Sequence, residues 1–456
     1  MGGYLAYAEY KDSGMEWLGE IPKHWGVKRL KFTSTVQPSN VDKKTDEDEE
    51  SVLLCNYSDV YNNAEITSKL EFMRATATQS EIEKFLIAKD QVIVTKDSET
   101  REDIAVPAYV AEDFENVLCG YHLTQIKPKE VFGKYLFRLF QSRQFNAQFI
   151  LGANGVTRFG LPQYVISNAL IAVPPIEEQR SIARFLDYKT AQIDALIARK
   201  ETLLKKLAEK RTALISQAVT KGLDRTLPMK DSGIEWLGEI PAHWDSVRLK
   251  HICSLVRDGT HLPPARVNKG VPLLSVRNIV NGKFINLDDD SLISEEDFKQ
   301  LQKSFDVKEI DILLAIVGAT LGKVAIVEKM PPFTIQRSLA VLRPKTDSCA
   351  FKFLFYFMIS LGFQKLLWTN VGYSAQPGIY LGSLANFHST VPPLEEQHRI
   401  IQFLDVEIGR IDALVTEVKM GIGKISEYRT ALITNAVTGK IDVRDVMLEP
   451  EPVEAA

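Results

Sequence analysis

Two stretches of the chain carry apolar residues at seven-residue intervals, with mostly polar residues between them. Each stretch follows a Pro-Pro pair whose second proline suits a first helical turn, and the two glutamates that come next favour the positive end of a helix dipole. Such a stripe predicts a long helix that packs against a partner helix. The rows are Leu186, Ile193, Lys200, Leu207 and Leu214 in the first stretch and Leu404, Ile411, Val418, Ile425 and Leu432 in the second.

Each predicted helix has the other copy available in the same chain, so we expect an intramolecular pair joined by the apolar members of these rows. A helix of about 32 residues would extend roughly 48 Å. Simple core packing inside a bundle is the plainer interpretation, and it is compatible with the pair. Gly421 and Gly423 interrupt the second stripe, at about 1 kcal/mol each relative to alanine. They mark a close approach or a bend, or they reflect neutral drift.

The chain also repeats itself, both before these stripes and along them. Lys11–Lys31 and Lys230–Lys250 share 16 of 21 positions, including W-L-G-E-I-P-x-H-W. A second repeated block begins at Val173 and Val391 and reads V-P-P-[IL]-E-E-Q, then F-L-D, I-D-A-L, R-T-A-L-I and A-V-T. The segments between the blocks, roughly 32–172 and 251–390, look almost unrelated. Two near-identical frames around two divergent inserts indicate one scaffold that presents two different surfaces.

The inserts have the pattern of mixed α+β domains. Short β-rich runs are separated by Gly, Asn and Asp, and Asn281-Gly282 is typical of a hairpin turn. Weak matches between the inserts, such as Leu53-Leu54 with Leu273-Leu274, predict one fold with two surfaces. The other matches pair Val92–Val94 with Ile312–Leu314 and Leu123-x-x-x-Lys127-Pro128 with Leu339-x-x-x-Arg343-Pro344. The predicted strands are Val52–Cys55, Gln91–Thr95, Pro272–Val276, Ile312–Val317 and Lys323–Val327.

Composition is ordinary for a soluble globular protein with two to four domains: 456 residues, 45% hydrophobic and a net charge of −4. No apolar run reaches the roughly 18 residues of a membrane span, and the N-terminus does not read as a secretory signal. The four cysteines, Cys55, Cys119, Cys253 and Cys349, are far apart. We therefore expect no disulfide framework, no metal site and a reducing cytoplasm.

Catalytic motifs are incomplete or missing. Gly318–Lys323 resembles a phosphate loop but has three residues between its glycines and no Ser or Thr after the lysine, so we expect a strand–turn–strand with a positive tip. Met330-Pro331-Pro332-Phe333 places methionine where adenine methyltransferases need Asn or Asp. The chain has no Pro-Asp dipeptide, with which the common nuclease signature P-D…D/E-x-K begins. It also has no H-E-x-x-H motif of the kind that binds zinc. We expect His24 and His243 to pack against Trp25 and Trp244.

The duplicated motifs strongly resemble the specificity subunit of type I restriction-modification systems, over essentially the whole chain. The resemblance implies an α+β protein with two mixed α/β target recognition domains separated by two long antiparallel helices. These helices would form an intramolecular coiled coil within a pseudo-two-fold repeat. The expected domains are a first recognition domain at 1–172, a first helical region at 173–224, a second recognition domain at 225–390, a second helical region at 391–443 and a disordered acidic tail at 444–456.

The same resemblance implies a division of labour. This chain would read one half of an asymmetric, two-part DNA site with each recognition domain, and its helices would set the spacer. It would hold no cofactor of its own. Two copies of a methylation subunit would carry S-adenosylmethionine for adenine N6 methylation, and motor-nuclease subunits would carry ATP and Mg.

Candidate DNA-contacting residues follow from loop placement, side-chain chemistry and alignment of the two inserts. Each could contact a base, contact a phosphate or be structural, and the acidic residues Asp97 and Glu99 argue against phosphate nearby. In the first insert the candidates are Asn56, Tyr57, Ser58, Lys96, Arg101, Tyr121, His122, Asn154, Thr157 and Arg158. In the second they are Arg257, Thr260, His261, Arg266, Arg277, Asn278, Gln336, Arg337, Ser338, Tyr373, Ser374 and Gln376.

Two other classes of function stay open at this point. One is a self-sufficient nuclease or methyltransferase with an unfamiliar site, which the missing cofactor loop argues against. The other is an interaction scaffold whose inserts bind proteins and therefore lack salt-dependent affinity for DNA.

Overall fold

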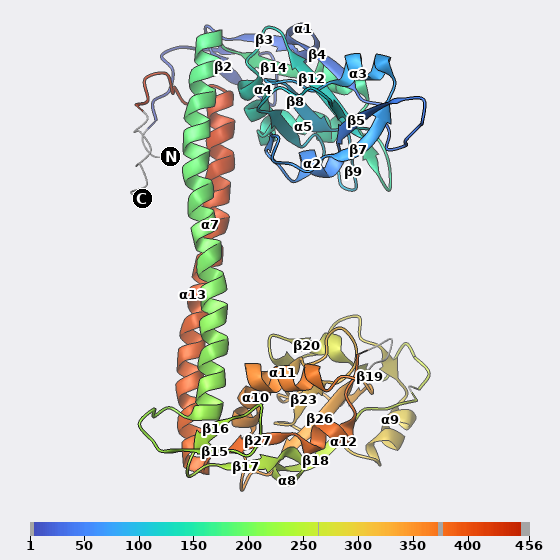
Figure 1. Cartoon of the computed structure of the whole chain (residues 1–456), viewed down its shortest axis with the longest axis vertical. Coiled ribbons are helices and arrows are strands. Elements are labelled where there is room, and N and C mark those ends of the chain that lie inside the picture. The colour runs from blue at the N-terminus through green and yellow to red at the C-terminus, as the bar shows by residue number, and fades with distance from the viewer. Residues whose placement is uncertain (1–3, 263, 373–376, 448–456) are drawn as a thin grey trace. The chain divides into compact units, whose positions relative to one another are not determined.

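The computed structural model describes residues 4–262, 264–372 and 377–447. The chain divides into two compact units (Figure 1). Unit 1 consists of Met1–Lys200 together with Met420–Ala456, and unit 2 consists of Glu201–Lys419. No helix among the described residues has the length and apolar character needed to cross a membrane. The candidates Tyr373, Ser374 and Gln376 lie outside the described residues.

Both predicted long helices are present. Helix α7 is Ile176–Lys221 (46 residues) and α13 is Leu394–Val437 (44 residues), both longer than the 32 residues we expected. They run on because nothing breaks them before Gly222 and Gly439, which have φ angles of +76° and +72° and suit the left-handed turn that ends many helices. A Cβ on Gly421 would meet only the Lys200 side chain, at 3.5 Å or more, so this glycine marks no close backbone approach.

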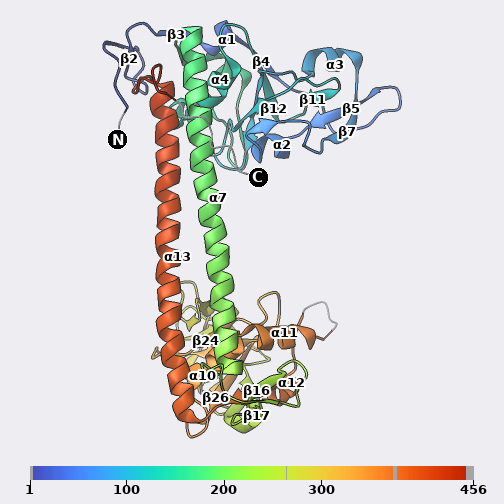
Figure 2. The same ribbon diagram turned by 60° about the vertical axis from the view of Figure 1, so that its left-hand side comes forward.

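Within each unit, part of α7 lies beside part of α13 (Figure 2). In unit 1, Arg429 Nε donates to Asp194 at 2.8 Å while Gly421 lies near Lys200, which makes the two segments antiparallel. In unit 2, Arg211 lies 3.5 Å from Asp412. The apolar rows face inward as predicted. Leu186, Leu404, Ile411, Val418 and Leu432 are buried, and Ile193, Leu207, Leu214 and Ile425 are half-buried.

Unit 1 is built on a five-stranded sheet. Its central strands, β12 and β8, are antiparallel and fully paired from Leu123 opposite Thr95 to Ile126 opposite Val92. A three-stranded sheet lies in the same unit, with β11 parallel to β5. The strand order of the five-stranded sheet is β4 (Ser34–Pro38), β12 (Leu123–Pro128), β8 (Val92–Thr95), β10 (Pro107–Val110), β6 (Glu65–Ile66). The strand order of the three-stranded sheet is β11 (Val117–Cys119), β5 (Glu50–Cys55), β7 (Met73–Ala77).

Unit 2 has the same arrangement, with one more strand at the edge of its larger sheet. Again two antiparallel strands lie near the centre, β26 and β23, and a parallel pair, β19 and β25, belongs to the smaller sheet. The strand order of the larger sheet is β18 (Cys253–Asp258), β26 (Leu339–Pro344), β23 (Ile312–Ala315), β24 (Val324–Ile326), β21 (Lys283–Phe284), β20 (Ile279–Val280). The strand order of the smaller sheet is β22 (Leu292–Ile293), β19 (Val271–Leu274), β25 (Thr334–Ile335).

These orders confirm that the inserts share one fold. The matched segments fall on equivalent strands: β5 with β19, β8 with β23 and β12 with β26. The expected hairpin at Asn281-Gly282 joins β20 to β21 with both residues at positive φ, as a two-residue turn requires. The glycine-rich segment 318–323 is a turn between β23 and β24, as expected for a strand–turn–strand.

Helices pack on each larger sheet in the same order. In unit 1 they are α4 (Gly133–Phe140), α5 (Arg143–Gly152) and α6 (Gln163–Asn168), and in unit 2 they are α10 (Phe351–Ile359), α11 (Leu361–Thr369) and α12 (Leu381–Asn386). The core of unit 1 includes Phe140, Phe145 and Phe149, together with Leu432 and Val437 from the end of α13. The core of unit 2 draws Ile215 and Val219 from the end of α7.

The repeated W-L-G-E-I-P-x-H-W motif lies where one long helix begins and the other ends. His24 Nε2 lies 2.7 Å from Glu178, whose other oxygen accepts from Trp25 Nε1 at 2.9 Å. His243 likewise lies 2.7 Å from Glu396. The expectation that these histidines mainly pack on tryptophan was therefore incomplete, because each histidine is bonded to the glutamate that begins a long helix.

The two terminal glycines offer a first test. Alanine at either Gly222 or Gly439 would hold a left-handed backbone, at a cost of roughly 1–2 kcal/mol. At Gly439 the new Cβ would also lie 2.3 Å from Pro22, whereas at Gly222 its nearest neighbour, in Trp244, is 3.3 Å away. We expect Gly439→Ala to lower the calorimetric unfolding midpoint more than Gly222→Ala. Equal shifts would show that the contact with Pro22 has no effect on stability.

Candidate DNA-reading edges

One edge of the larger sheet in unit 1 gathers three loops, and we call it the loop edge. Strands β4 and β8 end there and the antiparallel strand β12 begins there. Backbone hydrogen bonds tie the loops together: Ser39 N to Leu123 O at 2.9 Å and Lys96 N to His122 O at 2.9 Å. The loop before α6 joins them through Leu161 N and Lys96 O at 2.7 Å.

Unit 2 has an equivalent loop edge held by equivalent bonds. Gly259 N donates to Leu339 O at 3.1 Å, Ile316 N to Ser338 O at 2.9 Å, and Ile379 N to Ile316 O at 3.0 Å. The backbone of the two edges is therefore alike even though the side chains on them differ. This is the property that a scaffold with two interchangeable reading surfaces needs.

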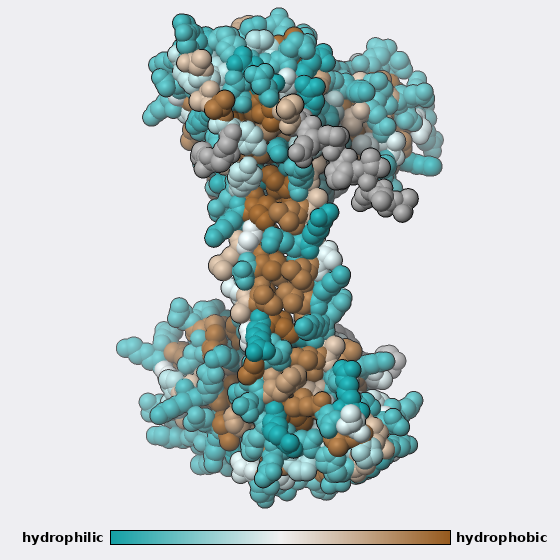
Figure 3. Space-filling view, turned by 90° about the vertical axis from the view of Figure 1, so that its left-hand side faces the viewer, coloured by the Kyte–Doolittle hydropathy of each residue, from teal (hydrophilic) through white to brown (hydrophobic). Residues whose placement is uncertain are grey.

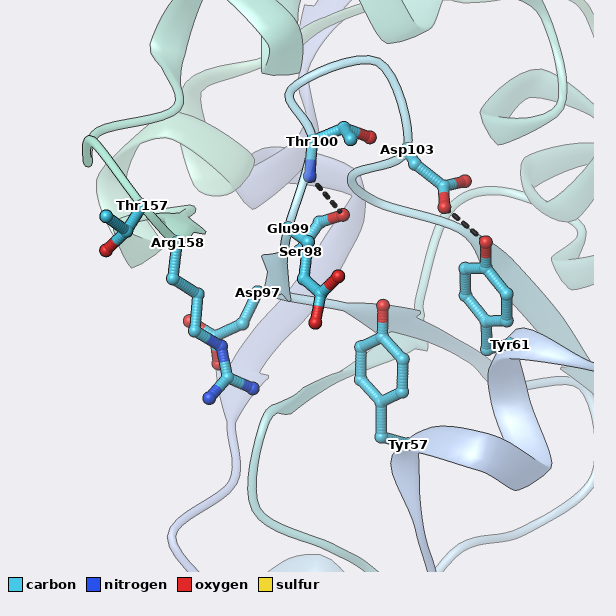
Figure 4. A pocket seen from close by; sticks show the side chains of 9 residues that line it. All are labelled: Tyr57, Tyr61, Asp97, Ser98, Glu99, Thr100, Asp103, Thr157 and Arg158. Carbon is cyan, nitrogen blue, oxygen red and sulfur yellow. Dashed lines mark hydrogen bonds between the residues drawn. The ribbon is translucent and has the colours of Figure 1, made fainter. Parts of the chain in front are cut away.

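The loop edge of unit 1 is hollowed into an open pocket of about 770 Å³ (Figure 4). Tyr57 and Tyr61 stand on helix α2 (Tyr57–Tyr61) with their rings stacked at 5.5 Å between centroids and their hydroxyls directed toward the loop after β8. Asp97 and Ser98 form the short strand β9 (Asp97–Ser98) in that segment, and Glu99, Thr100 and Asp103 follow it. Thr157 and Arg158 come directly before β13 (Phe159–Gly160), which pairs with β9.

Acidic groups set the electrostatics of this pocket. The Tyr61 hydroxyl donates to Asp103, and this bond raises the pKa of Tyr61. Burial raises the pKa of Tyr57, with the Asp103 carboxylate adding to the effect. The pocket thus offers carboxylate acceptors and one guanidinium, that of Arg158, which suits a ligand edge that presents N–H donors.

A second cluster lies beside the pocket. The Lys96 ammonium donates to Ser39 O at 3.0 Å and stands 4.6 Å from the centre of the Tyr121 ring, and burial lowers the pKa of Lys96. His122, at a φ of 72°, is bonded through Nδ1 to Asp97. Left-handed backbone is uncommon for residues other than glycine and often occurs at functional positions.

The loop edge of unit 2 is more basic. A pocket of about 410 Å³ is lined by Asp258, His261, Arg337 and Tyr380, among others. Asp258 holds His261 Nε2 at 2.7 Å, which leaves the other ring nitrogen available. Arg257 lines a neighbouring pocket that shares Asp258 and His261. One carboxylate and one tyrosine remain here, and histidine and arginine are added to them, whereas the pocket of unit 1 has three carboxylates and two tyrosines.

The predicted residues fall into two groups. Several are engaged inside their own unit: Asn56 takes part in the capping box of α2, and Asn278 and Arg277 both bond Asp290. Lys96 and His122 are half-buried, and Ser338 has a buried hydroxyl without a hydrogen bond. Gln336 is half-buried and pairs through its backbone with half-buried Thr260. The exposed ones are Ser58, Arg101, Tyr121, Asn154, Thr157, Arg158, Arg257, His261, Arg266 and Arg337, and Tyr57 is half-exposed at the pocket wall.

The lining residues missed as candidates include Tyr61, Asp103 and Tyr380. Asp97 and Glu99, considered above only as arguments against a nearby phosphate, also line the pocket of unit 1. Tyr61 is one helical turn from Tyr57, and that spacing alone could have suggested it. Tyr380 is an exposed aromatic residue in a loop, and such an aromatic cannot be told from a core residue without the fold. Among the described residues, no group of three or more His, Cys, Asp or Glu side chains is placed to hold a metal ion.

This architecture, two copies of a mixed α/β domain that carry loop edges with different side chains, defines a duplicated recognition protein. The model of the type I restriction modification DNA specificity domain matches residues 22–206 and again 241–419. The chain belongs to this family. Specificity subunits of these systems recognise DNA and are not themselves catalytic.

Relatives agree with this assignment. The specificity subunit of the type I restriction enzyme EcoBI of Escherichia coli is 27% identical over 63% of this chain and 62% of that subunit. The subunit of the putative type I restriction enzyme MjaX of Methanocaldococcus jannaschii is 25% identical over 94% of this chain and 96% of its own length.

Solved structures share the fold. A chain from a structure of the type I R-M system, concerned with complex assembly and conformational transition, aligns with a TM-score of 0.66 at 20% identity. The alignment covers 92% of this chain and 99% of that one. The HsdS subunit of Thermoanaerobacter tengcongensis aligns with a TM-score of 0.53 at 18% identity, over 92% and 98% of the two chains.

The contrast between two arginines of unit 2 gives a second prediction. Arg277 bonds Asp289 at 2.8 Å and the buried Asp290 at 2.7 Å, whereas Arg337 forms no ion pair with any described residue. Removing the charge of Arg277 leaves Asp290 without its cation, so we expect Arg277→Gln to lower the thermal unfolding midpoint. Arg337→Gln should leave it unchanged. A destabilised Arg337→Gln variant would assign that side chain a structural role.

Proposed function

We propose that the loop edge of each unit reads one half of an asymmetric, two-part site in double-stranded DNA. The observation that carries the proposal is the pair of loop edges with the same backbone hydrogen bonds and different side chains. A shared backbone places each set of loops alike on its own scaffold, and the side chains then determine which bases are preferred.

The chemistry of the two edges supports different half-sites. Carboxylates accept hydrogen bonds from cytosine N4, and arginine donates to guanine O6 and N7. The edge of unit 1 combines Asp97, Glu99 and Asp103 with Arg158, whereas that of unit 2 presents Arg257, His261 and Arg337. Because the edges differ, the two halves of the site would differ too, unlike the palindrome that a homodimer reads.

We further assign the long helices two tasks: they pair as a coiled coil that sets the spacer, and they dock two methylation subunits. Support for docking comes from apolar side chains that the helix pairing leaves exposed. Leu196 and Tyr428 are exposed in unit 1, and Leu203, Phe403 and Leu414 are exposed in unit 2. Apolar surface follows the helices (Figure 3), and such patches are typical of protein interfaces. S-adenosylmethionine would be held by the methylation subunit, and ATP and Mg by a motor-nuclease subunit.

The function is tested by mapping N6-methyladenine in DNA from a methylation-free host that expresses this chain with its cognate methylation subunit. We expect one two-part motif with a constant gap. Arg158→Gln should relax one half of the motif and Arg337→Gln the other, each by about 1–3 kcal/mol of base discrimination.

A soluble, assembled complex that methylates no motif would contradict the proposal and favour a protein-binding scaffold. Methylation by this chain without its partner would instead point to an enzyme.

Docking is tested with the double variant Leu203→Ser/Leu414→Ser. We expect it to bind the methylation subunit at least ~10-fold more weakly, because truncating a hot spot at the centre of an interface costs about 2 kcal/mol or more. Leu223→Ser is the matched control, since this leucine is equally exposed but lies beyond the end of α7. Titration calorimetry measures both. Equal affinity in the variant and the control would place the docking surface elsewhere.

A further inference from the structure

The aspartate of the repeated F-L-D motif makes the same contact in both units. In unit 1, Asp187 of α7 accepts from Arg138 Nη2 at 2.7 Å and from Lys134 Nζ at 3.0 Å. Both cations belong to α4, the helix that follows the central strand β12. Asp187 therefore joins the long helix α7 to the side of α4, the helix that packs on the larger sheet of unit 1.

Asp405 of α13 occupies the equivalent position in unit 2. It accepts from Lys352 Nζ and from the Tyr356 hydroxyl, each at 2.5 Å. Both partners belong to α10, which follows the central strand β26. The partners are lysine and arginine in unit 1 and lysine and tyrosine in unit 2. The aspartate is kept, and it contacts the equivalent helix in each unit.

The glutamine of the E-E-Q motif bonds the backbone at the start of α4 in unit 1 and at the start of α10 in unit 2. Gln179 Oε1 accepts from Phe132 N, and Gln397 Oε1 accepts from Ala350 N, each at 2.8 Å. Phe132 and Ala350 are the N-terminal caps of α4 and α10. Each of these helices is thus fixed at two points, at its start by a glutamine and along its side by an aspartate, which leaves it little freedom to pivot.

The aspartates are only partly buried, with exposed side-chain fractions of 33% for Asp187 and 37% for Asp405. In unit 1 the partner Arg138 is only 9% exposed, and breaking an ion pair with a buried member is destabilising, so Asp187 also supports the stability of its unit. In unit 2 the pair is partly exposed on both sides, with 42% for Lys352, and such a pair contributes little to overall stability. A contact that recurs with altered partners and different contributions to stability is better explained by the geometry it imposes. In unit 1 the loop edge lies at the start of β12, α4 follows that strand, and Asp187 bonds α4 to the long helix. In unit 2 the corresponding elements are β26, α10 and Asp405.

We propose that Asp187 and Asp405 are positioning residues that fix the angle of each unit's larger sheet on its long helix and so fix the gap between the half-sites. This inference rests on the proposed function. It concerns the distance at which the halves are read, because neither aspartate lies at a loop edge.

The test uses the complex with the methylation subunit and DNA in which the mapped half-sites are separated by the native gap or by one base pair more or less. One base pair moves a half-site by about 3.4 Å. We expect the wild-type complex to prefer the native gap strongly, and Asp187→Asn or Asp405→Asn to reduce that preference roughly tenfold, the effect of losing hydrogen bonds to a charged group. The sequence of each half-site should stay unchanged.

Matched controls are Glu177→Gln on α7 and Glu407→Gln on α13, whose ion pairs are with arginines of the same helix. Lys352→Gln removes a half-exposed partner of Asp405 and provides a second variant if Asp405→Asn does not fold. Unchanged gap preference in the assembled Asp405→Asn and Lys352→Gln complexes would overturn the assignment. Loss of methylation at every gap by an assembled complex would also overturn it. A wild-type complex without a two-part motif would instead remove the proposed function, and this inference with it.

Discussion

The structure depends on the burial of one apolar face on each long helix. Neither helix can shield that face alone, and most helical stability in proteins comes from such tertiary packing. The inner face of α7 is covered by α13 within both units, and the ends of both helices then enter the cores of the units. Leu432 and Val437 complete one core, and Ile215 and Val219 the other. The larger sheet of each unit is therefore built on a helix pair and not on its own insert alone.

The two units show how a fold can be kept while its surface diverges. Backbone hydrogen bonds hold the loops at both edges, so the side chains there are free to change without loss of the scaffold. Tyr57, Asp103 and Arg158 on one edge contrast with Arg257, His261 and Arg337 on the other. The repeated motifs lie away from these edges. His24 bonds Glu178 near the start of α7, and Gln179 bonds Phe132 at the start of α4. These contacts hold the scaffold together, which explains why the motifs recur when the inserts do not.

Much of the fold could be predicted from the sequence because its signals are local or repeated. The seven-residue rows predicted the helices and their inner faces, and the Asn281-Gly282 turn predicted its hairpin. The site was harder, because it depends on which loops meet. Nothing near Asn278 in the sequence indicates that its amide bonds Asp290, and nothing near Asp258 places it beside Arg337. Helix length was underestimated because the stopping residues, Gly222 and Gly439, lie beyond the apolar rows.

Unit 1 is assembled from the two ends of the described chain, and this has a consequence for biosynthesis. The Tyr10 hydroxyl donates to Gly439 O at 3.0 Å, and Asp442 N donates to Leu5 O at 2.7 Å, across more than four hundred residues. Unit 2 is continuous from Glu201 to Lys419. During synthesis unit 2 can complete its core as soon as Lys419 has left the ribosome, whereas unit 1 must wait for the final turns of α13. The first unit to begin translation is thus the last to complete its core, which stays accessible to chaperones for most of synthesis.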